Sequence, residues 1–195
     1  MIEPVINYSI EVENIARDFA NAQVPTSMDI YSRGTQSNKE KVREDIITGK
    51  LGEYCVYKYF RDVLKQPITE PDLNIYRGNK NWNPDMMSSN TPIHVKSCIE
   101  YDDYKNSWII QDSLLRRDPV LDATDSSIMI FVSVCRFERW GEICGAVKVT
   151  NLRERNLFKA PRLERLIKEK KAVYAQDVIS LPEYMRWEGI INGNL

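Results

Sequence analysis

The fold is decided by Trp82-Asn83-Pro84-Asp85 and Thr91-Pro92-Ile93-His94-Val95-Lys96-Ser97, two strand-like pieces joined by a polar turn. Successive side chains of a strand point to opposite faces, so His94 and Lys96 share one face of the second piece. If the pieces pair as a hairpin, Asp85 comes to lie beside them. A carboxylate, an imidazole and an ammonium on one surface suit metal-assisted hydrolysis. The structural alternative is a Pro-Asp turn followed by a solvated edge lysine.

The composition is that of an ordinary globular protein. Of 195 residues 43% are hydrophobic and only 8 are glycine, which predicts a single domain over 1–195. Within it we expect an N-terminal helix and connector (1–38), a core (39–150) and a basic, helical C-terminal region (151–195). The formal net charge is −1, so any surface for nucleic acid must come from local patches.

Cysteine usage and hydropathy predict the compartment. The four cysteines, at positions 55, 98, 135 and 144, form no Cys-x-x-Cys pair, which argues against a zinc knuckle and for free thiols in a reducing compartment. No apolar run approaches transmembrane length, and the N-terminus lacks the basic start of a signal peptide. We therefore expect a soluble, cytoplasmic protein with no membrane partner.

Two helices are expected in the first third of the chain. Apolar residues recur at helical spacing in residues 9–23, which predicts a packing helix, and residues 24–38 read as a polar connector. The stronger pattern covers residues 39–64, with Ser37 or Asn38 as the N-cap.

Two glycines interrupt that second pattern. Each costs about 1 kcal/mol relative to alanine inside a helix, so either the helix breaks near Gly49 or another element approaches closely at Gly52. Glu53 follows directly, at the edge of the apolar stripe. Its carboxylate is either a half-exposed surface charge, which is the commoner case, or a group aimed at the sheet.

Strand signals cluster in the middle of the chain. The expected strands are 72–76, 84–86, 93–98, 107–111, 127–134 and 142–149. Residues 127–134 are almost continuously apolar, as in a central strand covered on both faces. A helix followed by several strands and further helices predicts an α/β (α+β) domain with a mixed sheet.

The order of these features resembles a known family. Gly52-Glu53 on a helix, then Pro84-Asp85, then a strand with Val95-Lys96, then a strand ending in Gln111 resemble the PD-(D/E)xK nuclease superfamily. The likeness covers roughly residues 45 to 135. It implies a restriction-endonuclease-like mixed sheet flanked by helices. It also implies metal-dependent hydrolysis of nucleic-acid phosphodiester bonds, in the first place by a DNA endonuclease of restriction, repair or phage type.

The resemblance also implies roles for single residues. It makes Asp85 a ligand of Mg²⁺ or Mn²⁺ and Lys96 the group that orients the attacking water. Glu53 becomes an auxiliary ligand or a nearby acid, and Gln111 a polar group of the site. On its chemistry we expect Lys96 to act as a positioned cation that stabilises charge on the phosphate.

His94 departs from the family pattern, which has an acidic residue at this position. Imidazole binds manganese and other transition metals but is a poorer ligand than carboxylate for magnesium. Three alternatives stay open. His94 is a metal ligand in a nuclease with altered metal preference, or the enzyme recruits Glu53 or another acid, or the site is degenerate and only binds.

The C-terminal third carries a basic patch. From Arg153 to Lys171, eight basic residues face three acidic ones, and helical spacing predicts an amphipathic helix that begins at Pro161. A solvated helix is the bland alternative to phosphate binding. The residues expected to bind nucleic acid are Arg116, Arg117, Arg153, Arg155, Arg162, Arg165 and Lys168.

Double-stranded DNA is the expected partner. One active site per chain makes a two-fold homodimer the simplest arrangement for cutting both strands. The rivals are a non-catalytic nucleic-acid-binding protein on the same fold, and an interaction domain whose basic helix binds an acidic protein.

Overall fold

The computed structural model describes residues 4–32, 38–75, 83–100, 106–113, 117–123 and 127–187, without the side chains of 29–32. The strands are β1 (Val5–Asn7), β2 (Met86–Ser88), β3 (Thr91–Ile99), β4 (Ser107–Gln111), β5 (Ile128–Cys135), β6 (Trp140–Lys148) and β7 (Lys170–Tyr174). The helices are α1 (Ile10–Ser32), α2 (Lys39–Lys58), α3 (Val149–Glu154) and α4 (Leu181–Trp187). This is a mixed α/β fold, as the sequence predicted.

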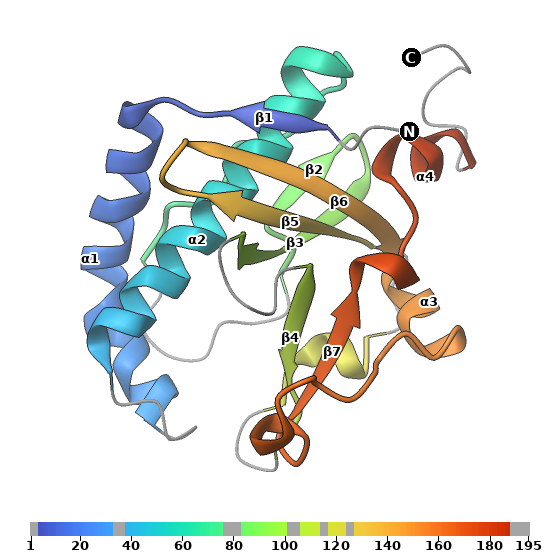
Figure 1. Ribbon diagram of the computed structural model, residues 1–195. Coiled ribbons are helices and arrows are strands. Elements are labelled where there is room, and N and C mark those ends of the chain that lie inside the picture. The colour runs from blue at the N-terminus through green and yellow to red at the C-terminus, as the bar shows by residue number, and fades with distance from the viewer. Residues whose placement is uncertain are drawn as a thin grey trace.

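The main sheet has five strands in the order β1-β6-β5-β3-β2, and β4 and β7 form a separate two-stranded sheet (Figure 1). β3 and β5 run parallel, whereas the other neighbours are antiparallel. All eight residues of β5 are buried, which confirms the central strand expected at 127–134. β2 and β3 form the predicted hairpin, in which Met86 pairs with Ile93.

Both faces of the sheet are covered. α1 and α2 lie side by side on one face, where Leu51 of α2 shares a core with Ile93 and Ile130 (Figure 1). A second core contains Trp108 of β4 together with Phe131 of β5. The rings of these two residues are 4.9 Å apart between centroids. The second core thus joins the small sheet to the main one.

α2 follows the predicted span closely. The Asn38 side chain accepts hydrogen bonds from the amides of Glu40 (3.0 Å) and Lys41 (3.2 Å), so Asn38 is the N-cap. The helix passes Gly49 without a break and ends in a π-helical turn, Tyr59–Val63. At Gly52 a Cβ atom would lie 1.9 Å from Ser97 Oγ of β3, so this glycine permits the close approach of helix and strand.

We expect Gly52→Ala to lower the free energy of unfolding by about 1–3 kcal/mol, the usual effect of overpacking a core contact. Gly49→Ala is the matched control, because nothing lies within 4 Å of its added methyl group. That change should be neutral or stabilising by up to about 1 kcal/mol. Urea unfolding measures both, and equal effects would contradict the assigned contact at Gly52.

α1 is longer than predicted. The sequence indicated an end near residue 23 and a polar connector, yet the helix continues through Pro25 to Ser32. The Thr26 hydroxyl donates to the Gln23 carbonyl (2.8 Å) and accepts from the Gln23 side-chain amide (2.8 Å). These local bonds and the packing of α1 against α2 outweigh the hydrogen bond that proline cannot make.

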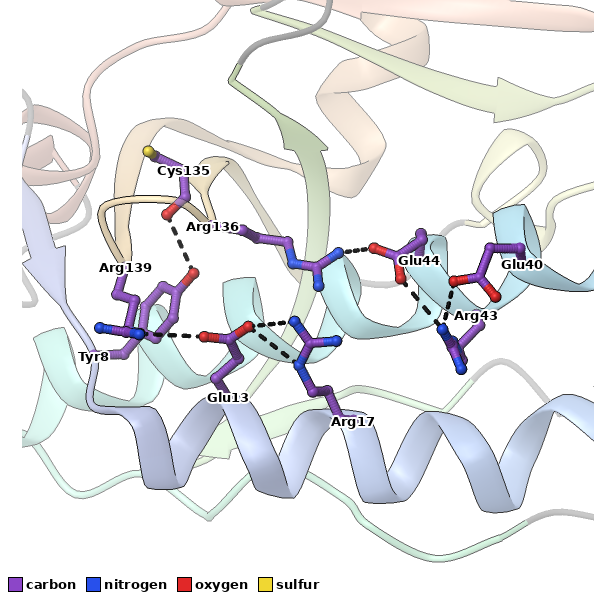
Figure 2. Close-up of polar contacts among 9 residues, drawn as sticks. All are labelled: Tyr8, Glu13, Arg17, Glu40, Arg43, Glu44, Cys135, Arg136 and Arg139. Carbon is purple, nitrogen blue, oxygen red and sulfur yellow. Dashed lines mark hydrogen bonds and ion pairs between the residues drawn. The ribbon is translucent and has the colours of Figure 1, made fainter.

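Charged side chains fix both helices to the turn between β5 and β6 (Figure 2). The Glu13 carboxylate of α1 accepts from Arg17 (2.6 Å) and from Arg139 of that turn (3.2 Å). Burial raises the pKa of Glu13, but these hydrogen bonds outweigh it, so the pKa lies below its usual value. Arg136 of the same turn pairs with Glu44 of α2. The helix pair is therefore held in place above the sheet.

The expected strand at 72–76 is wrong for the part that the structure describes. Residues 72–75 form no strand, and Tyr76 lies outside the described residues. The Asp72 carboxylate accepts from the Asn74 amide (2.9 Å), and the Asp72 carbonyl accepts from Lys50 (2.7 Å). Local turn bonds and a buried lysine thus replace the strand ladder.

The basic helix expected from Pro161 is also wrong. The segment contains only a 3-10 turn at Glu164–Leu166 and then enters β7. β7 pairs with β4 so that Val173 lies opposite Trp108, both in the second core. Burial of Val173 in this ladder makes residues 170–174 a strand, so the end of the expected helix has an extended conformation. Neither β7 nor β1 was predicted from the sequence.

The cysteines agree with the prediction of free thiols. All four are unbridged; Cys55, Cys135 and Cys144 are buried and Cys98 is half-buried. In the described part of the chain, no helix combines the length and apolarity needed to cross a membrane.

Candidate active site

β3 presents two different faces. Ile93 and Ser97 face α2, since Ile93 belongs to its core and Ser97 meets Gly52. By alternation, His94 and Lys96 point to the opposite face. Their parallel partners on β5 are Met129 and Phe131, which belong to the second core. The two motif side chains therefore share one face, as the sequence predicted.

The hairpin sets Asp85 next to His94. The Asp85 amide donates to the Ile93 carbonyl (2.9 Å), and its carboxylate accepts from the Val95 amide (2.8 Å). Asp85 is thus bonded to both neighbours of His94. His94 is only 5% exposed, whereas Asp85 is half-buried.

Lys96 has a partner that the sequence did not reveal. Its Nζ donates to Asp118 Oδ2 at 2.6 Å. The other oxygen of Asp118 accepts from the Val120 amide (3.1 Å), and the Asp118 amide donates to the Gln111 carbonyl (2.9 Å). Asp118 therefore ties Lys96 to the end of β4. The dipeptide Asp-Pro after Gln111 was the available signal, because it favours an N-cap.

Gln111 lies at the end of β4, as expected. Its side-chain amide donates to Ser113 Oγ (3.1 Å). Through the backbone bond to Asp118 it belongs to the surroundings of Lys96. The structure thus brings together two of the predicted residues, Lys96 and Gln111, with one unpredicted carboxylate.

Glu53 is a buried group, so the expectation of a half-exposed surface charge is wrong. It is 7% exposed and its carboxylate accepts from Lys50 Nζ at 2.7 Å. Lys50 also donates to the Asp72 carbonyl and lies 4.7 Å from the Phe19 ring centroid. Glu53 is in α2, one residue after the glycine that contacts Ser97, and so lies on the side of the sheet that α2 covers.

A pocket of about 440 Å³ opens along the free edge of β3. β2 pairs with β3 only as far as Ile93, so the later residues of β3 have no strand on that side among the described residues. Lys96, Gln111 and Asp118 line the pocket, whereas Asp85, His94 and Glu53 are absent from its described lining. The predicted residues thus lie in three places: Asp85 and His94 at the hairpin, Lys96 and Gln111 at the pocket, and Glu53 beside Lys50 in α2.

The side chains able to bind a metal ion decide which metal site is chemically reasonable. In the described part of the chain, no three His, Cys, Asp or Glu side chains are gathered closely enough to hold a metal ion. Magnesium is commonly held by one or two carboxylates together with waters and substrate phosphates. Asp85 is half-buried and offers one carboxylate for such a site, whereas Glu53 is paired with Lys50 on the α2 side of β3. The metal-ligand role predicted for His94 stays a prediction.

Several of the expected DNA-binding residues are engaged within the protein. Arg117 pairs with Asp112 and Asp122, and Arg153 donates to the Ala123 carbonyl (2.8 Å). Arg155 lines a separate, smaller pocket. Arg116 lies outside the described residues.

The basic segment before β7 divides into two sets. Arg162 lines the same pocket as Lys96. All three are exposed, but Arg165 and Lys168 are not part of the described lining of that pocket. The sequence treated these three cations as equivalent, and the structure distinguishes them.

Comparisons with protein-family models, with curated proteins and with solved structures find no match to this chain. The geometry described above therefore carries the functional argument. The resemblance to a nuclease family stays a prediction from the order of the motifs.

Proposed function

We propose that the protein is a metal-dependent phosphodiesterase that cleaves nucleic acid, with double-stranded DNA as its substrate and Mg²⁺ or Mn²⁺ as its cofactor. The observation that supports this most directly is that two elements, the hairpin segment that carries Asp85 and the helix α2, contact β3. Asp85 is bonded to Ile93 and Val95, and Gly52, next to Glu53, meets Ser97, next to Lys96. The acidic motif residues thus come from two elements that touch β3, and Lys96 stands on the face of β3 opposite α2.

Each residue has a role that follows from its contacts. Asp85 holds the cation, which when bound neutralises charge on the phosphate. Lys96, held by Asp118, is a positioned cation that orients water and stabilises the charge that develops on the phosphate. Glu53 is a nearby buried acid on the α2 side of β3, and Lys50 balances its charge there.

A second candidate is a protein with the same site that binds nucleic acid without cutting it. The observation in its favour is that both Glu53 and Lys96 already have partners of opposite charge. A site whose charges are satisfied internally needs a rearrangement before it acts on substrate. The two candidates share the binding surface and differ in turnover.

Incubation with supercoiled plasmid and with linear genomic DNA, in Mg²⁺ and separately in Mn²⁺, distinguishes them. We expect nicked and linear products that disappear when EDTA is added. A mobility shift without products would select the binding protein. Absence of both products and shift would refute both candidates and favour a domain that binds another protein. Sedimentation of the active fraction tests whether double-strand cutting requires a dimer.

A further inference from the structure

The pocket at the free edge of β3 has three well-defined walls. Lys41, Asp45 and Thr48 are spaced so that they share one face of α2, and Ser107, Ile109 and Gln111 alternate along β4. Segment 161–166 forms the third wall. A volume of about 440 Å³ falls within the usual range for small-molecule sites.

The described lining of this pocket carries an excess of positive charge. Its cations are Lys41, Lys96, Arg162 and Lys170, against the carboxylates of Asp45 and Asp118. Asp45 pairs with Lys41 at 2.8 Å and Asp118 pairs with Lys96 at 2.6 Å. The four cations of the described lining outnumber its two carboxylates, which favours an anionic ligand.

Arg162 is held in position before any ligand arrives. Its guanidinium carbon lies 4.9 Å from the centroid of the Tyr174 ring. Tyr174 is buried, and its hydroxyl donates to the Ala160 carbonyl (2.8 Å). Lys170 lies opposite Gln111 in the β4–β7 ladder. Lys170 thus stands on the small sheet, and the guanidinium of Arg162, stacked on a fixed ring, loses little freedom when it binds a phosphate.

Apolar side chains lie beside these cations. Ile99 and Ile109 come from the two strands, and Leu163 and Leu166 from the third wall. An inorganic anion gains no binding energy from apolar side chains, whereas a nucleotide presents a phosphate together with a flat base that can pack against them. We propose that the pocket binds one nucleotide unit of a nucleic-acid strand, with its phosphate at Arg162 and Lys170 and its base against the apolar wall.

That the nucleotide belongs to a nucleic-acid strand rests on the proposed function. Binding of a single nucleotide is tested without any cleavage assay. Titration calorimetry on the full chain, without metal, uses thymidine 5′-monophosphate, thymidine and inorganic phosphate as probes. We expect the monophosphate to bind at least about tenfold more tightly than either of the others, because only it engages both the cations and the apolar wall.

Two double variants provide the matched comparison. Arg162→Gln with Lys170→Gln should weaken binding of the monophosphate at least about tenfold. Arg165→Gln with Lys168→Gln removes the same charge from the same segment but outside the described lining, and should leave binding unchanged. Melting by circular dichroism checks that each variant is folded. If the first double variant does not fold, Arg162→Gln alone replaces it, because Arg162 is outside the β7 ladder.

Ile109→Thr tests the apolar wall, since it keeps a β-branched residue on β4 while reducing the apolar surface. The change should weaken binding of the monophosphate and leave binding of inorganic phosphate unchanged. Equal losses in the two double variants, or equal affinity for thymidine and its monophosphate, would overturn the proposal. Affinity for phosphate equal to that for the monophosphate would also overturn it, because it would reduce the pocket to an anion site. Monophosphate binding without DNA cleavage would refute the phosphodiesterase and leave the pocket standing.

Discussion

Asp85→Asn is expected to abolish DNA cleavage while the hairpin stays folded. The asparagine side-chain oxygen can still accept the hydrogen bond from the Val95 amide, which is 2.8 Å long in the wild type. The variant therefore loses the charge that would hold the cation and little else. A bound cation contributes several kcal/mol to stabilising a phosphoryl transition state, so the rate should fall at least about 100-fold.

Asp62→Asn is the control for this change. Asp62 is a carboxylate near the surface that pairs with its neighbour Arg61. It is not part of the hairpin. Single-turnover nicking of plasmid in Mg²⁺ and in Mn²⁺ gives the rates, and thermal melting gives the stabilities. DNA binding by Asp85→Asn should be unchanged or tighter, because a negative charge near the phosphates is gone. A rate equal to that of Asp62→Asn would move the chemistry away from the hairpin, with Asp118 as the next carboxylate to test.

Elements encoded by local patterns were predictable. The run Ser127–Val134 is apolar because β5 is covered on both faces, and its burial needs no knowledge of its neighbours. Asn38 caps α2 through its own side chain. The turn between Ser88 and Thr91 allows only a short connection, so the hairpin followed from the sequence, and with it the position of Asp85 near His94.

The surroundings of the site were not predictable, because they depend on pairs distant in the chain. Asp118 meets Lys96 from 22 residues away. Lys50 and Glu53 stand at a helical spacing that is common on surfaces, and only packing against Asp72 and Phe19 makes the pair buried. Pairing with β4 likewise makes a strand of residues 170–174, the end of the segment that local spacing had indicated to be helical.

His94→Glu should have the second largest effect, and its sign depends on the role of the site. His94 is 5% exposed and lies in register with Met129 on β5. A glutamate there would bring a second carboxylate next to Asp85 in a nearly dry position. A buried charge without a partner is strongly unfavourable, so without metal the free energy of unfolding should fall by about 3 kcal/mol or more.

If position 94 is a ligand position, a divalent cation will neutralise the two carboxylates together. Mg²⁺ should then raise the melting temperature of His94→Glu more than that of the wild type, because binding to the folded state alone stabilises it. Metal preference in cleavage should also shift toward Mg²⁺, since an oxygen ligand replaces a nitrogen ligand. His94→Gln is the matched control: it has the same length as glutamate but no charge, and it should show neither effect.

The alternatives for His94 give different patterns in the same melts and assays. If His94 transfers protons while Glu53 supplies the second carboxylate, both variants should lose activity in both metals, together with any rate limb between about pH 6 and 7. If the site only binds, His94→Glu should be destabilised equally with Mg²⁺, with Mn²⁺ and with EDTA. Recovery of stability by Mg²⁺ in His94→Glu and not in His94→Gln is the one result that requires a cation beside β3, because no change in packing alone responds to the metal.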